Sequence, residues 1–106
     1  MTTEKFKLFE AIYYILDSIW KDNQQEDLAI YLSEADPTLC KNDSADPAVF
    51  SEFCQIYDNC NDKNISNYDF SIYYLEHFDP YYGDIKKYFT QIPKDECEAK
   101  LTELLK

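Results

Sequence analysis

The stretch from Glu4 to Lys21, "EKFKLFEAIYYILDSIWK", decides the fold class, because its apolar residues recur with the period of an α-helix. At about 100° per residue, one helical face collects large apolar side chains: Leu8, Phe9, Ile12, Ile15, Leu16, Ile19 and Trp20. The opposite face carries Lys7, Glu10, Asp17 and Lys21. A helix with one such apolar stripe must bury it against other elements, so the sequence predicts a long helix at the centre of a helical domain.

Two further helices are indicated by caps and by a proline. The second is opened by one of two candidate caps, Asp22 or Asn23, and its apolar positions are Leu28, Tyr31 and Leu32. Asp46 followed by Pro47 predicts the start of a third helix, because proline at the first helical position lacks only an N–H that would have no helical partner. The buried stripe of this third helix is expected at Phe50, Phe53, Cys54 and Tyr57.

The C-terminal part of the chain carries signals for three more helices. Ser66 and Asp69 form a capping box that opens a fourth helix, and Pro80 must end it. Two shorter helices are expected at about 82–91 and 94–105. Their core positions are predicted at Ile85, Phe89, Cys97, Leu101 and Leu104.

The composition agrees with a helical domain. The 106 residues include a single glycine, the residue that tight turns between strands often require, and 45% of them are hydrophobic, which is unlike a disordered chain. A chain of this length forms one core. We therefore expect an all-α fold, a single-domain bundle of five to six helices over residues 1–106, with the helices at 4–21 and after Ser66 at its centre.

The formal net charge of −11 is concentrated in the middle of the chain. Fourteen acidic residues lie between Asp22 and Asp84, with only Lys41 and Lys63 to oppose them, whereas both ends are nearly balanced. Such an acidic block speeds encounter with a basic partner and repels the phosphates of nucleic acids. The sequence therefore predicts a basic protein partner and no direct nucleic-acid binding.

The most unusual segment is "YDFSIYYLEHFDPYYGD" (68–84), with seven aromatic rings and the only histidine and glycine of the chain. On a helical wheel its first part shows one arc with Tyr68, Ser71, Ile72, Leu75 and Phe78, and a nearly opposite arc with Phe70, Tyr73, Tyr74 and His77. The second arc has two interpretations. It belongs to a central helix packed on both sides, or it forms an exposed tyrosine patch rimmed by acids, of the kind that is enriched at interfaces.

No pattern predicts catalysis or a bound cofactor. His77 is the only imidazole, no nucleophile motif such as G-x-S-x-G is present, and no glycine-rich loop could hold a phosphate. The segment 58–69 departs from a calcium loop, because Cys60 and Lys63 stand where a ligand and a glycine are required. We expect no enzyme activity, no cofactor and no metal.

The cysteines and the N-terminus bear on the compartment. Cys40, Cys54, Cys60 and Cys97 form no C-x-x-C pair, so free and mostly buried thiols in a reducing compartment are expected. The first ten residues are too polar for a signal peptide, and no apolar run approaches the ~20 residues of a membrane span. These features predict a cytoplasmic protein without a membrane partner.

Two phrases, "LAIYLSEADPTL" (28–39) and "SADPAVFSEF" (44–53), carry a family resemblance. Together they resemble small, acidic, helical proteins of Gram-positive bacteria that look like immunity proteins of polymorphic or contact-dependent growth inhibition toxin systems. The most specific shared element is the pair of Ala-Asp-Pro triplets at 35–37 and 45–47. The resemblance implies tight, non-catalytic neutralisation of a cognate toxin domain, and no motif fixes which toxin is bound. Our first hypothesis is an inhibitor of a basic toxin of the nuclease type.

The expected partner-binding surface combines the acids around these triplets with the aromatic segment. Its predicted residues are Glu34, Asp36, Asp43, Asp46, Glu52, Asp69, Tyr73, Tyr74, Glu76, His77, Asp79, Tyr81 and Tyr82. The alternatives are an acidic mimic of nucleic acid that inhibits a DNA-binding system, a structural or adaptor domain whose tyrosines are buried, and a homodimer that uses the tyrosine face. Accessibility of Tyr73 and Tyr74 distinguishes the adaptor from the inhibitor.

Overall fold

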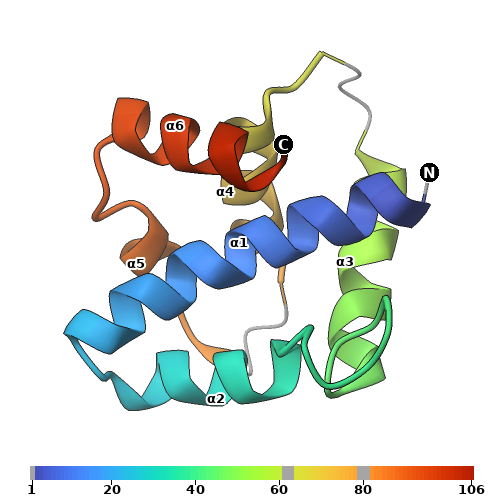
Figure 1. The fold of residues 1–106 in the computed structure, drawn as a ribbon, viewed down its shortest axis with the longest axis horizontal. Helices are drawn as coiled ribbons and strands as arrows, with labels where there is room; N and C mark the ends of the chain where they lie inside the picture. The colour runs from blue at the N-terminus through green and yellow to red at the C-terminus, as the bar shows by residue number, and fades with distance from the viewer. Residues whose placement is uncertain (1, 61–63, 79–81) are drawn as a thin grey trace.

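The structure, a computed structural model, describes residues 2–60, 64–78 and 82–106, and these residues form an all-α bundle (Figure 1). Its helices are α1 (Thr2–Asp22), α2 (Glu26–Ala35), α3 (Pro47–Asn59), α4 (Asn67–His77), α5 (Lys86–Phe89) and α6 (Lys94–Leu104). The predicted fold class is confirmed. Within the described residues, no helix is both long enough and apolar enough to cross a membrane.

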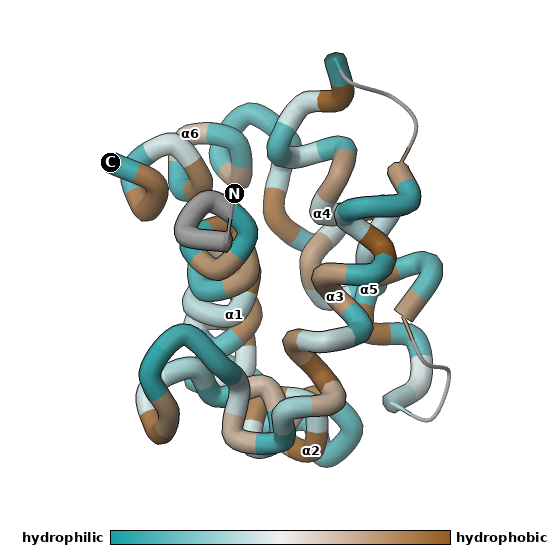
Figure 2. Tube along the Cα trace, turned by 90° about the vertical axis from the view of Figure 1, so that its right-hand side faces the viewer, coloured by the Kyte–Doolittle hydropathy of each residue, from teal (hydrophilic) through white to brown (hydrophobic). Residues whose placement is uncertain are grey.

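Helix α1 is the central element of the bundle, as its pattern predicts. It packs against α2, α3, α5 and α6, and Figure 2 shows it on one side of the molecule with α3, α4 and α5 on the other. Five of its seven predicted core residues are buried, and Ile19 and Trp20 near its end are half-buried. Helix α4 is the second hub, in contact with α3, α5 and α6. One continuous core therefore joins all the helices described.

The predicted caps are confirmed at two helices and wrong at a third. The Asp46 carboxylate accepts a hydrogen bond from Ala48 N at 3.0 Å at the start of α3, and Ser66 Oγ accepts one from Asp69 N at 3.0 Å at the start of α4. Helix α2, in contrast, begins at Glu26 after Gln25, which makes no side-chain capping bond. Helix α1 continues to Asp22, so this candidate cap of α2 is itself the last residue of α1.

The predicted helix over 82–91 is reduced to the four residues of α5 (Figure 1). Gly83 has φ = +79°, a left-handed conformation that an α-helix cannot include, so the helix starts only after this turn. The core positions Ile85, Phe89, Cys97 and Leu101 are buried as expected. Leu104 is 44% exposed, so its predicted core role is wrong, whereas the next residue, Leu105, is partly buried against the core.

The buried stripe of α4 differs from both arcs of the helical wheel. Its fully or nearly fully buried residues are Phe70, Ser71, Tyr74, Leu75 and Phe78. This set takes about half of each predicted arc, because α4 is enclosed by α3 on one side and by α5 and α6 on the other. The outward face of α4 then carries Asp69, Tyr73, Glu76 and His77.

Candidate protein-interaction surface

The segment that joins α2 to α3, residues 36–46, contains three of the predicted acids, Asp36, Asp43 and Asp46, and a fourth, Glu34, lies just before it in the last turn of α2. Two main-chain hydrogen bonds close it at its base, from Ala45 N to Asp36 O at 2.9 Å and from Asp46 N to Glu34 O at 2.8 Å. A β-bridge between Cys40 and Asp43 tightens its tip, where Asn42 has φ = 57°. We call this segment with Glu34 the acidic loop.

Two carboxylates of the acidic loop, those of Asp36 and Asp43, accept hydrogen bonds from the loop itself. Asp36 Oδ1 accepts bonds from Thr38 N at 2.8 Å and Thr38 Oγ1 at 2.6 Å, and Asp43 Oδ1 accepts one from Ser44 N at 2.8 Å. Ser44 is fully buried, and its hydroxyl donates to Asp46 O and accepts from Phe50 N. These bonds hold the loop in one conformation but leave its negative charge in place.

The ion pairs of the described residues lie elsewhere. Lysines pair with Asp17, Asp27, Asp58, Glu76 and Glu103. Within the described part of the chain, none of the ion pairs includes a carboxylate of the acidic loop. The four acids therefore form a region of negative charge that no described lysine neutralises by direct contact.

Glu34 and Glu52 are half-buried, as are Asp36, Asp43 and Asp46. One carboxylate oxygen of Glu34, Oε2, is buried without a hydrogen bond from any described residue. The charge of Glu52 is among the smaller causes that raise the pKa of Tyr74, after burial and the neighbouring Tyr31. Of the two glutamates, Glu34 belongs to the acidic loop and Glu52 to α3.

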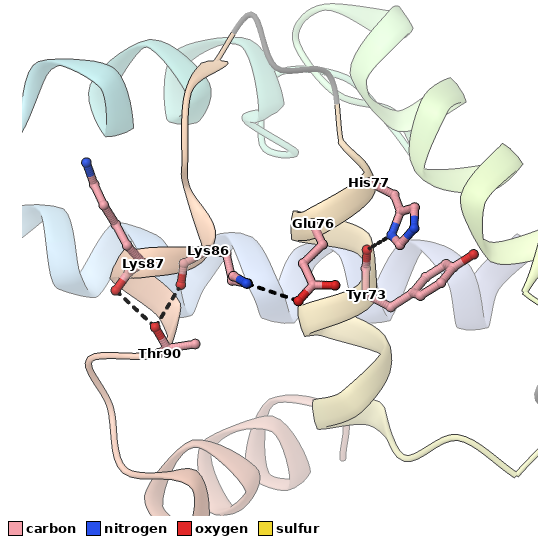
Figure 3. A network of polar contacts seen from close by, with 6 residues as sticks. All are labelled: Tyr73, Glu76, His77, Lys86, Lys87 and Thr90. Carbon is pink, nitrogen blue, oxygen red and sulfur yellow. Dashed lines mark hydrogen bonds and ion pairs between the residues drawn. The ribbon is translucent and has the colours of Figure 1, made fainter.

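The outward face of α4 presents a second set of predicted residues, drawn in Figure 3. The rings of Tyr73 and His77 stack with centroids 4.1 Å apart, and His77 Nδ1 lies 2.8 Å from Tyr73 O. Glu76 points to the other side, where Lys86 Nζ of α5 lies 3.0 Å from Glu76 Oε1. Asp69 is exposed in the first turn of the same helix. The face is thus mixed, with an aromatic pair and two acids.

Two predicted contact residues are wrong because they belong to the core. Tyr74 is 0% exposed and Tyr82 only 9%. The Tyr74 ring packs against Phe53 and its hydroxyl lies against that of Tyr31, while the Tyr82 ring stacks on Phe78. Neither ring can contact a partner in this conformation. Asp79 and Tyr81, also predicted, lie outside the described residues.

A hollow beside Glu76 is lined in part by Asp84 and Lys86, which no sequence pattern singled out. It has a volume of about 360 Å³ and is lined by Leu75, Glu76, Phe78, Gly83, Asp84 and Lys86. Asp84 and Lys86 lie eight and ten residues after Glu76, across the turn at Gly83, so no helical or strand period relates them. Only the position of the 83–86 segment against α4 brings these charges together.

Groups that could hold a metal ion do not gather in the described residues. No three His, Cys, Asp or Glu side chains among them are close enough to hold a metal ion. All four cysteines are free thiols, but they are not mostly buried as predicted: Cys97 is buried, Cys54 and Cys60 are half-buried, and Cys40 is exposed. The prominent chemistry of the described surface is its negative charge.

Comparison with known proteins adds no identity to this description. The chain matches no protein-family model, no curated protein and no solved structure. The function is therefore inferred from the surface described above.

Proposed function

We propose that this protein is a non-enzymatic inhibitor that binds a basic protein partner through its acidic loop, as an immunity protein binds a toxin domain. The observation that carries the proposal is the acidic loop itself. Three of its four carboxylates, those of Asp36, Asp43 and Asp46, accept main-chain hydrogen bonds, and none of the four forms an ion pair with a described lysine. A surface whose charges are fixed before binding loses less conformational entropy when the partner docks.

The distribution of charge supports a protein target with a positive surface. The acidic block at 22–84 carries the whole charge imbalance of the chain. A surface rich in negative charge speeds association with a positively charged partner. The burial of Tyr74 and Tyr82 moves the proposed contact area away from the tyrosines and toward the loop. The proposed interface is therefore more polar than the sequence suggested.

The test is capture of the partner from lysate of the source organism at low and at high salt. The informative variant is Asp36→Asn/Asp43→Asn/Asp46→Asn, because asparagine keeps an oxygen for each observed hydrogen bond and removes only the charge. The control is Asp95→Asn/Glu96→Gln/Glu103→Gln, which removes three exposed charges from α6.

We expect the wild type and the control to retain a basic polypeptide that salt releases, and the loop variant to retain much less. Equal retention by the loop variant would place the interface elsewhere. Capture of a DNA-binding protein would favour a nucleic-acid mimic, and recovery of this chain alone would favour an adaptor or a homodimer.

A further inference from the structure

The hollow between α4 and the 83–86 segment has a floor and a rim of different chemistry. Leu75 and Phe78, which are 6% and 7% exposed, contribute its apolar floor. Glu76, Asp84 and Lys86 contribute the charges at its rim, two negative and one positive. An apolar floor below an acidic rim suits a side chain that has an aliphatic stem and a cationic head.

The cation already present at this rim is held weakly. Lys86 Nζ lies 3.0 Å from Glu76 Oε1, but the two side chains are 36% and 44% exposed. Ion pairs with this exposure contribute only about 0–1 kcal/mol, since water and salt screen them. A cation from another molecule can therefore replace Lys86 beside Glu76 at little cost.

We propose that this hollow is the site at which an arginine side chain of the basic partner docks, an inference that rests on the proposed function. Its net negative rim is complementary to a guanidinium group. Arginine fits better than lysine, because the guanidinium is planar, is more weakly hydrated and has five N–H donors with which to reach two carboxylates. The partner would thus contact both the acidic loop and the hollow.

The experiment uses three short peptides as probes: acetyl-Gly-Arg-Gly-amide, the same peptide with lysine, and the same peptide with the uncharged arginine analogue citrulline. Each is titrated into the ¹⁵N-labelled protein and followed by NMR. Gly83 lines the hollow and is the only glycine of the chain, so its amide signal is an unambiguous reporter. We expect saturable shifts at Gly83 and Glu76, strongest with arginine and weakest with citrulline.

Substitutions of the acidic and the basic rim residues should change the affinity for the arginine peptide in opposite directions. Glu76→Gln and Asp84→Asn should each weaken binding of the arginine peptide roughly two- to fivefold, the range for exposed ion pairs. Lys86→Met should strengthen binding by a similar factor, because it removes the internal competitor for Glu76. Asp95→Asn and Lys100→Met make the same changes of net charge on exposed positions of α6 and should leave binding unchanged.

Several results would overturn the inference. Shifts confined to residues 36–46 would show that the peptide binds the acidic loop, which rejects the hollow and leaves the proposed function standing. Equal shifts with citrulline would show that the hollow does not recognise charge. Absence of a saturable shift, or weaker binding of the arginine peptide by Lys86→Met, would also reject the hollow. The proposed function would then still be tested separately, by the salt-dependent capture experiment with the acidic-loop variant.

Discussion

The hydroxyl oxygens of Tyr31 and Tyr74 lie 3.1 Å apart in the centre of the protein, although 43 positions separate the two residues in the chain. Both side chains are 0% exposed. One hydroxyl donates to the other, so two polar groups that burial would otherwise leave without a bond are satisfied together. This contact connects α2 to α4 and explains why the tyrosines of α4 do not all face solvent.

Replacing both of these tyrosines by phenylalanine should destabilise the protein less than the two single replacements together. Tyr31→Phe or Tyr74→Phe leaves the other hydroxyl buried and removes its bond, at a cost of about 1–3 kcal/mol in the free energy of unfolding. The double variant removes both polar groups and should cost less than the sum of the single variants. Urea denaturation followed by circular dichroism measures all three, and strict additivity would show that the hydroxyls do not interact.

Adjacent tyrosines of α4 should respond differently to truncation. Tyr74→Ala creates a cavity beside Phe53 and should lower the free energy of unfolding by about 3–5 kcal/mol. Tyr73→Ala removes a half-buried ring that stacks on His77 and should cost clearly less. Urea denaturation of the two variants compares them directly. Equal losses would mean that Tyr73 contributes to the core as much as Tyr74 does.

Alkaline pH should unfold the protein through its buried tyrosines. Burial, with smaller effects from nearby acids, raises the pKa of Tyr13 and Tyr88 to about 12, and burial raises the pKa of Tyr31 and Tyr74 further above the ordinary value of 10.0. A raised folded-state pKa gives stability that is complete below the unfolded-state pKa and is lost as the pH rises above it.

We therefore expect unfolding to begin above about pH 10, the ordinary tyrosine pKa. Ultraviolet absorbance of the phenolate should show two classes of tyrosine, one that ionises in the folded protein and one that ionises only with loss of helical circular dichroism. Ionisation of all ten tyrosines before the helices are lost would contradict this prediction.

Acid pH should act on the contact between α2 and α5. Burial acts to raise the pKa of Asp27, but hydrogen bonds from Tyr88 Oη at 2.6 Å and Leu28 N at 2.9 Å, with the charge of Lys87, outweigh burial and lower this pKa below 3.8. A lowered folded-state pKa gives stability that is complete above the unfolded-state value and is lost as the pH falls through the folded-state value.

Tyr88→Phe tests the Asp27 contact, because it removes the hydroxyl donor and little else. The pKa of Asp27 should rise toward its ordinary value, and the variant should begin to unfold at a higher pH than the wild type in an acid titration. Tyr68→Phe is the control, since the half-buried Tyr68 makes no hydrogen bond to Asp27. Identical acid transitions for wild type and Tyr88→Phe would show that this bond does not contribute.

The cap of α3 should matter for folding, and its charge should not. Asp46→Ala removes the acceptor of the 3.0 Å bond from Ala48 N and should cost about 1 kcal/mol of stability. Asp46→Asn keeps an acceptor and should differ from the wild type by only a few tenths of a kcal/mol. Thermal unfolding separates these variants. A large loss in Asp46→Asn would show that the charge itself stabilises the helix, and would complicate its use in the binding test.

Local signals in the sequence were reliable where their physics is local. The Asp46 and Ser66 caps and the amphipathic stripe of α1 depend on residues within one or two turns, and the structure confirms them. The acids around the two Ala-Asp-Pro triplets also come together, because main-chain hydrogen bonds from Ala45 N to Asp36 O and from Asp46 N to Glu34 O join the end of α2 to the start of α3. The helical class and the acidic loop could therefore be predicted.

The helical wheel of α4 did not predict which of its side chains are buried. Its sequence offers two apolar arcs of similar strength, and both Tyr73 and Tyr74 lie on the same predicted arc. The structure buries Tyr74 and leaves Tyr73 partly exposed, because α3 covers only half of that arc and Tyr31 of α2 provides a hydroxyl partner at one position. The sequence of residues 67–77 alone therefore does not determine which of the two tyrosines is buried.

The sequence by itself determined the helices, two of their caps and the uneven distribution of charge, since these depend on composition and on neighbours along the chain. Only the tertiary structure decided which tyrosines are core, where α5 begins and which charges meet at the hollow of Glu76, Asp84 and Lys86. The physical reason is that burial and ion pairing depend on distances in space, and residues far apart in the chain acquire these distances only when the helices pack.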